Sequence, residues 1–381
     1  MEAYLDYNAT TPVDPAVFEA MKPFLTHDFA NASSIHRKGQ TARHAVESAR
    51  EKIADVLEVE PGDVIFTSGG TEADNLAVRG AILSRLLERR HLVVSAIEHQ
   101  AVLHPARYLE SLGCEVSVVP VTPDGIIDLE KLKAAISEKT SLVSLMHVNN
   151  EIGTIQPIEE AARLAHDKGA YFHVDAVQSF GKLALHPEAS GIDLLSISSH
   201  KICGPKGSGA AYIRKGLKIK PIFFGGHQEK NVRPGTENVA AIAGFGKAAE
   251  LTEKNKTVES KRVGALRDRL QRGIQKKIQG SLENGNPKKR IYNTLNISFE
   301  GIDGETLLMN LDLKNICVST GSACTAGSIE PSHVLIALGL PDKIARAAVR
   351  FSLGRFTTET EVDYVLAELP GIVERLRKSA T

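Results

Sequence analysis

The chain has 381 residues, a length that suits two or three domains and can bury a sizeable core without disulfide or metal staples. Hydrophobic residues make up 42% and charged residues 24%, proportions that exclude disordered and collagen-like chains. The 46 basic side chains balance the 46 acidic ones, which argues against a whole-surface binder of nucleic acid or anionic membranes.

Neither a membrane span nor a signal peptide is expected. The apolar runs are strand-sized, and the N-terminal MEAYLDYNATTPVDP has acidic residues where a signal peptide has basic and then apolar ones. We therefore expect a cytoplasmic protein. Four cysteines without a CxxC pair predict neither a disulfide framework nor a metal site; they are Cys114, Cys203, Cys317 and Cys324.

Short apolar, β-branched runs recur along the first part of the chain, with amphipathic helical stretches between several of them. Seven strand candidates span residues 63–68, 91–97, 115–121, 141–148, 171–175, 194–198 and 210–214. Strands without clean alternation that are separated by helices predict an α/β fold with a mainly parallel seven-stranded sheet, covered on both faces. Ligands of such sheets bind beyond the carboxyl ends of the strands.

The pattern changes after about residue 250. Residues 253–290 predict a long helical segment with twelve Lys or Arg against four Asp or Glu. The strand-like TLNISF, ICVST and AAVRFSLG and a final helix from about 358 predict a smaller α+β domain. The basic segment is a solvated helix face, which we favour, or a docking patch for an acidic partner protein. Nucleic-acid binding is not expected there, because aromatic residues are not interleaved with the basic ones.

The segment SGGTEADN, residues 68–75, follows a strand and opens a helix. Gly69 and Gly70 allow a tight turn and a close approach of a ligand. Thr71 is predicted to cap the helix with Asp74 as its reciprocal partner, and the N–H groups at a helix start can bind an anion. The alternative is an ordinary capped helix that binds nothing.

Two later strand ends carry a carboxylate and a lysine. Asp175, in FHVDAVQSFGK, is either a helix N-cap or a partner for a protonated ring nitrogen, and Gln178 follows it. Lys201 follows a strand beside Ser198 and His200. A desolvated lysine has a lowered pKa and can form an imine, whereas a lysine in a surface loop is the commoner alternative.

These three segments occur in the order phosphate cradle, acid and lysine, all at strand ends of one sheet. They are the features that pyridoxal 5'-phosphate (PLP) requires, so the sequence points to PLP as the cofactor. The glycines after Lys201 precede a strand rather than a helix, so they are not a dinucleotide fingerprint, and GxxxxGK[ST] is absent.

Two further residues are candidates for chemistry. His99, in SAIEHQAV, is a structural histidine or, in a PLP site, a ring-stacking group that moves protons. Cys324 lies among Gly, Ser, Ala and Thr in STGSACTAGSIEPSHVL, a composition for which we expect mobility. We interpret Cys324 as a travelling nucleophile, with an unremarkable loop cysteine as the alternative. The other three cysteines fit buried structural positions better.

Nine segments then match the motifs of a known family. They are YLDYNATTP, SGGTEADN, EHQAV, HVNNEIGTIQPI, HVDAVQS, SSHKICGPKG, RPGTEN, STGSACTAGSIEPSHVL and VRFSLGRFTTETEVD. The chain resembles the cysteine desulfurases of the NifS/IscS type, which belong to the class V aminotransferases with PLP fold type I. The resemblance covers nearly the whole chain in the right order, and SGSAC separates this branch from ordinary class V transaminases.

The resemblance implies a role for each site residue. Lys201 would form the imine with PLP and take the α-proton, Asp175 would pair with the pyridine nitrogen, and His99 would stack on the ring. Arg350 would bind the carboxylate of L-cysteine, and Cys324 would attack its sulfur. The remaining positions would hold the cofactor: Gln178 and Asn150 at its phenolic oxygen side (Asn150 also near the substrate carboxylate), Gly70, Thr71, Ser198 and His200 at its phosphate, and Thr236 at the phosphate of the neighbouring subunit.

The implied reaction converts L-cysteine to L-alanine and leaves a persulfide on Cys324. The sulfur would pass to an acceptor protein, an iron–sulfur scaffold or a thiolation relay, in a reducing compartment. The contact of Thr236 implies an obligate homodimer. The resemblance also implies a large PLP-binding domain over 16–256 and a small domain, 1–15 with 257–381, that carries Cys324.

Two departures and two alternatives remain. Ala32 stands in NASSIH where the family often has Pro, and we expect only a local backbone change. The chain stops at Thr381, whereas relatives devoted to general iron–sulfur assembly often carry a longer docking tail, so a more specialised role stays open.

A transaminase or selenocysteine lyase would share the lysine and acid without needing Cys324. A non-enzymatic protein on this fold usually loses the lysine or the acid, and this chain keeps both.

Overall fold

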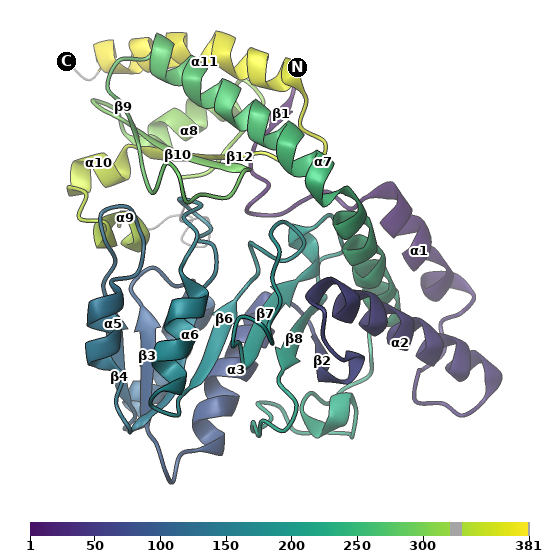
Figure 1. The fold of residues 1–381 in the computed structure, drawn as a ribbon. Helices are drawn as coiled ribbons and strands as arrows, with labels where there is room; N and C mark the ends of the chain where they lie inside the picture. Colours follow the sequence, from purple (N-terminus) through teal and green to yellow (C-terminus); the bar gives the residue numbers. More distant parts are fainter. Residues whose placement is uncertain (321–329, 380–381) are drawn as a thin grey trace.

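The computed structural model describes residues 1–320 and 330–379 (Figure 1). A seven-stranded sheet organises the larger part of the chain, in the order β2 (Val64–Thr67), β8 (Gly209–Ile213), β7 (Leu194–Ser198), β6 (Tyr171–Asp175), β5 (Thr140–Met146), β3 (His91–Ser95), β4 (Glu115–Val119). The strands from β7 to β4 are parallel, and β8 is antiparallel to both of its neighbours. The prediction of a mainly parallel seven-stranded sheet is confirmed, and each predicted run overlaps one strand.

Helices cover both faces of this sheet, which explains why its strands are apolar without alternation. Every residue of β5 is buried, for example. The helices of this part are α1 (Pro15–Thr26), α2 (Arg37–Leu57), α3 (Gly70–Ser84), α4 (Gln100–Ser111), α5 (Leu129–Ala135) and α6 (Ile158–His166), with short 3-10 turns η1 (Pro61–Asp63), η2 (Ser199–Lys201) and η3 (Glu229–Asn231).

The remaining elements form a smaller part, at the top of Figure 1. It contains the antiparallel sheet β12 (Ala348–Ser352), β10 (Thr294–Phe299), β9 (Ser281–Glu283) and the helices α8 (Gly304–Asp312), α9 (His333–Ala337), α10 (Asp342–Arg346), α11 (Glu359–Ser379). The first strand, β1 (Ala3–Tyr4), pairs in parallel with β11 (Ile316–Cys317). The N-terminus therefore belongs to the part that is built from the end of the chain.

Helix α7 (Val239–Lys277) is 39 residues long and joins the two parts. It packs on α1 and α2 near its start and on α11 near its end. The prediction of one helical segment over 253–290 is wrong at both ends, because the helix begins at Val239 and ends at Lys277, after which Ile278 has extended backbone angles.

The chain contains two large, separate apolar clusters, and the division into 16–256 and 1–15 with 257–381 stays a prediction. One cluster includes Val17 and Ala249, and the other includes Ala3, Val263 and Val373. The predicted boundary lies inside α7, and this helix contributes side chains to both clusters. Within the described ranges, no helix is long and apolar enough to span a membrane.

Candidate active site

The carboxyl ends of the parallel strands open onto a cavity of about 500 Å³ beneath the smaller part of the chain. Ten of the predicted site residues line it: Gly70, Thr71, His99, Asn150, Asp175, Gln178, Ser198, His200, Lys201 and Arg350. Thr236 does not line it and lies exposed before α7. Cys324 lies outside the described residues.

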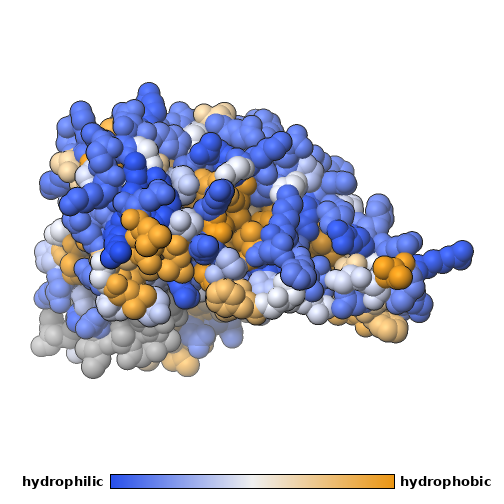
Figure 2. Space-filling model, turned by 90° about the horizontal axis from the view of Figure 1, so that it is seen from below, coloured by the Kyte–Doolittle hydropathy of each residue, from blue (hydrophilic) through white to orange (hydrophobic). Residues whose placement is uncertain are grey.

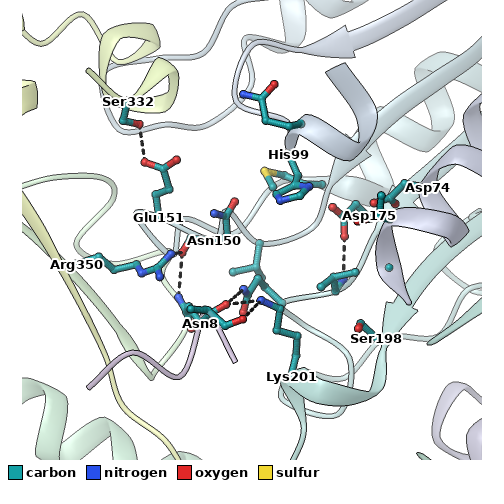
Figure 3. Close-up of a pocket in the computed structure, with 18 of the residues that line it drawn as sticks. Asn8, Asp74, His99, Asn150, Glu151, Asp175, Ser198, Lys201, Ser332 and Arg350 are labelled. Carbon is teal, nitrogen blue, oxygen red and sulfur yellow. Dashed lines mark hydrogen bonds between the residues drawn. The ribbon is translucent and has the colours of Figure 1, made fainter. Parts of the chain in front are cut away.

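Lys201 lies at the floor of the cavity, at the end of η2 directly after β7 (Figure 3). Its Nζ donates to the backbone oxygen of Ala9 at 2.8 Å and to that of Asn8. The polar N-terminal segment, which leaves β1 and crosses beneath the cavity, therefore holds the amine through main-chain carbonyls. Asn8 was not identified from the sequence, because nothing local marks a carbonyl as a lysine partner.

Asp175 ends β6 and is buried, and its carboxylate accepts a hydrogen bond from Val177 N at 2.9 Å. Burial raises the pKa of Asp175, and the facing His99 and Lys201 oppose that rise. His99 caps α4, and its Nδ1 accepts from Ala101 N at 3.1 Å. Since Nδ1 accepts, a neutral His99 carries its proton on Nε2, and burial lowers its pKa.

A buried network behind Asp175 was missed by sequence analysis. It contains Asp74, which burial keeps at a raised pKa, and His173, whose pKa burial lowers to about 3. Atoms His173 Nε2 and Asp74 Oδ1 lie 3.7 Å apart. The prediction that Asp74 pairs with a capping Thr71 is wrong: α3 begins at Gly70, and Asp74 faces the sheet instead.

The end of the cavity next to α3 fits a phosphate group. Ser198 Oγ is buried and has no hydrogen-bond partner in the described part of the chain. A Cβ added to Gly70 would lie 2.6 Å from a methyl carbon of Val177, so this turn tolerates only glycine without rearrangement. The start of α3 supplies N–H donors. His200 contacts Thr10 Oγ1 at 3.1 Å, and burial lowers its pKa to about 4, so its ring is neutral.

Arg350, on β12, lines the cavity from the smaller part of the chain. It is 1% exposed, and it donates to Asp6 Oδ1 at 2.7 Å and to Asn150 O at 2.9 Å. Its buried Nε has no partner among residues 1–320 and 330–379. A buried guanidinium with an unsatisfied donor suits the binding of a carboxylate.

Glu151 and Ser332 form a contact that was not predicted. Ser332 caps α9, and its hydroxyl donates to the buried Glu151 carboxyl, whose pKa burial raises. The polar run NNE after β5 was the available signal.

The other three cysteines were expected at buried structural positions. Cys114 and Cys203 are buried as expected, whereas Cys317 is partly exposed. The described residues contain no cluster that could hold a metal ion.

Comparisons with known proteins identify the family and the fold of this chain. A family model described as "Aminotransferase class-V" matches residues 3–365. A cysteine desulfurase IscS of Dictyoglomus turgidum is 48% identical over 376 residues, which cover 99% of this chain and 95% of the relative. A solved NifS-like protein has a TM-score of 0.93 at 39% identity and covers 99% of this chain and 100% of its own length. "SspA in complex with cysteine" has a TM-score of 0.84 at 37% identity, with coverages of 93% and 100%. This chain therefore belongs to the class V aminotransferase family and has the PLP fold type I of the NifS-like proteins.

Proposed function

We propose that this protein is a PLP-dependent cysteine desulfurase. The observation that carries the proposal is one cavity that contains an amine at Lys201, a buried carboxylate at Asp175, and a buried arginine with an unsatisfied donor at Arg350. The family is PLP-dependent, and relatives at 46–48% identity over nearly the whole chain are named cysteine desulfurases. The similar SspA structure was solved with cysteine, which supports L-cysteine as the substrate.

The residues present fit the cofactor. Lys201 would hold its aldehyde carbon, Asp175 its pyridine nitrogen, and Ser198, His200 and the start of α3 its phosphate; Gln178 and Asn150 would lie at its phenolic oxygen side. When bound, PLP supplies an electron sink for negative charge that develops on the substrate. The unsatisfied Ser198 hydroxyl and the space that Gly70 leaves open support the phosphate position.

The protein side chains then perform binding and proton transfer. Arg350 pairs with the substrate carboxylate and fixes the orientation of the amino acid. Lys201 accepts the α-proton, for which its position on the cavity floor is suitable. His99, neutral near pH 7, moves a proton through Nε2. Cys324 attacks the substrate sulfur, so that the carbon–sulfur bond breaks, the sulfur remains on Cys324 as a persulfide, and L-alanine leaves.

We further propose a homodimer in which Thr236 reaches the phosphate of the partner's cofactor. Its exposure outside the cavity of its own chain supports this role. Large apolar side chains are exposed on the larger part, for example Phe224 at 90% and Ile35 at 92%. Figure 2 shows apolar patches on the underside of the molecule, as expected for a surface that a second copy covers.

The acceptor of the sulfur would be an iron–sulfur scaffold or a thiolation relay, and the reaction would take place in the cytoplasm. A persulfide is easily oxidised or reduced, which favours a reducing compartment and a protein acceptor that takes the sulfur directly.

The test incubates purified holoenzyme with L-cysteine and a reductant and measures sulfide and alanine together. The Cys324→Ala and Lys201→Ala variants should lose sulfide release, and Cys317→Ser is the matched control that should keep it. Mass spectrometry should find one added sulfur atom on Cys324 after a single turnover. Unchanged sulfide release by Cys324→Ala would show instead a lyase or transaminase that does not need this thiol.

A further inference from the structure

Lys182 lies directly behind the active-site wall, and none of the roles assigned above uses it. Its side chain is partly buried, and its Nζ donates to Gln178 Oε1 at 3.3 Å. Lys182 and Lys201 both line a second, small cavity of about 20 Å³, separate from the main one. A second amine therefore shares a confined space with the proposed imine-forming lysine.

The contact with Lys182 fixes the orientation of the Gln178 amide. An ammonium group has donors and no acceptor, so it can bind only the oxygen end of the amide. The nitrogen end then donates to Asn8 O at 2.9 Å, and the same carbonyl accepts from Lys201 Nζ. A reversed amide would set donor against donor and oxygen against oxygen, so both contacts would become repulsive.

Charged groups from several elements face Lys182. The titratable side chains that line the small cavity with it are Tyr7, Lys201, Cys203, Glu259, Tyr292 and Arg355. Glu259, on α7, pairs with Arg355 at 2.9 Å, so part of its charge is already compensated. Burial lowers the pKa of Lys182 to about 8, while Glu259 and Cys203 oppose this shift. Lys182 is therefore mainly charged at neutral pH, and its charge adds to burial, the main cause that lowers the pKa of His200.

We propose that Lys182 is a positioning residue of this active site: it holds the nitrogen end of Gln178 toward the Asn8 carbonyl and places a positive charge behind Lys201 at neutral pH. The inference rests on the proposed function only for the identity of the cofactor. Lys182 is assigned no contact with substrate or cofactor. It acts on the amine of Lys201 indirectly, through its contact with Gln178 and through its charge.

The test compares the holoenzymes Lys182→Met, Lys182→Gln and Lys182→Arg by titrating the visible absorbance of the bound cofactor with pH. A positive charge near Lys201 disfavours a second one there, so the Met and Gln variants should raise the titration midpoint by roughly half a unit to one unit. The Arg variant keeps both the charge and the donor-only character and should restore the wild-type midpoint.

Lys247→Met is the matched control, because it removes another partly buried lysine, which pairs with Glu250 on α7. It should leave the midpoint unchanged. Thermal melting of the cofactor-free proteins measures folding separately. If the Met variant folds poorly, the absorbance midpoints of the Gln and Arg variants still test the proposal. Equal midpoints in wild type and the Gln variant, or equal shifts in Gln and Arg, overturn the proposal. The absorbance needs bound cofactor but no turnover, so a wild type that titrates normally yet releases no alanine refutes only the desulfurase activity.

Discussion

His173 should make the fold sensitive to mild acid, and replacing it with glutamine should remove that sensitivity. The side chain is 0% exposed and contacts Ser144 Oγ and Ser196 Oγ at 2.8 and 2.9 Å. Burial lowers its pKa to about 3 in the folded protein, against about 6.5 in an unfolded chain. Below pH 6.5 the unfolded state therefore binds more protons than the folded state, and stability falls as the pH decreases toward 3. At ~1.36 kcal/mol per pH unit, acidification from pH 7 to pH 5 should cost about 2 kcal/mol.

The assay is urea denaturation of the cofactor-free wild type and His173→Gln at pH 7, 6 and 5. Glutamine keeps a donor and an acceptor for the two serines, so the variant should fold. Asp74, whose pKa burial raises, acts in the opposite direction, but it is present in both proteins and cancels in the difference. His44→Gln, at an exposed position on α2, is the control. Equal losses in wild type and His173→Gln would refute the reasoning and indicate a protonated His173 paired with an ionised Asp74.

Three further predictions concern single contacts. Gly70→Ala should weaken PLP binding by about tenfold, because the new Cβ would lie 2.6 Å from a valine methyl carbon and the turn must shift; absorbance titration of the stripped protein measures this, and unchanged affinity would contradict it. Arg50→Met should lower the free energy of unfolding by about 3–5 kcal/mol, because the buried Glu229 loses its bidentate partner. Urea denaturation measures this loss, and a loss below ~1 kcal/mol would show that Glu229 finds another donor. Ser332→Ala should lower the free energy of unfolding by about 1–3 kcal/mol, because the buried Glu151 carboxyl loses its donor. Ser332→Thr keeps the hydroxyl and should melt like the wild type. Equal melting of all three proteins would show that the Ser332 hydroxyl does not stabilise Glu151.

The sequence predicted those parts of the site that local patterns mark. Asp175 and Lys201 follow apolar strands directly, and the carboxyl ends of parallel strands meet at one edge, so their proximity could be expected. The roles of Arg350 and Thr236 came instead from family resemblance, since neither position has a local chemical signal. The reaction itself, from L-cysteine to L-alanine and a persulfide, was also inferred from family resemblance.

Contacts that depend on long-range packing were not predicted. Asn8 and Lys201 are 193 residues apart in sequence, and their contact needs both parts of the molecule to be folded. The capping role given to Thr71 failed for a similar reason: Asp74 has the right spacing for a cap, but it lies on the face of α3 that packs against the sheet. Tertiary packing thus overrode a correct local rule.

The pairing of β1 with β11 has a consequence for synthesis on the ribosome. Ala3 pairs with Ile316 in this ladder, and Ile316 is translated more than 300 residues after Ala3. Strand β1 therefore lacks its strand partner until these later residues have been translated. The segment that follows β1 supplies the Asn8 and Ala9 carbonyls that bind Lys201. We therefore expect the contacts of Lys201 to be completed only after β1 has paired with β11.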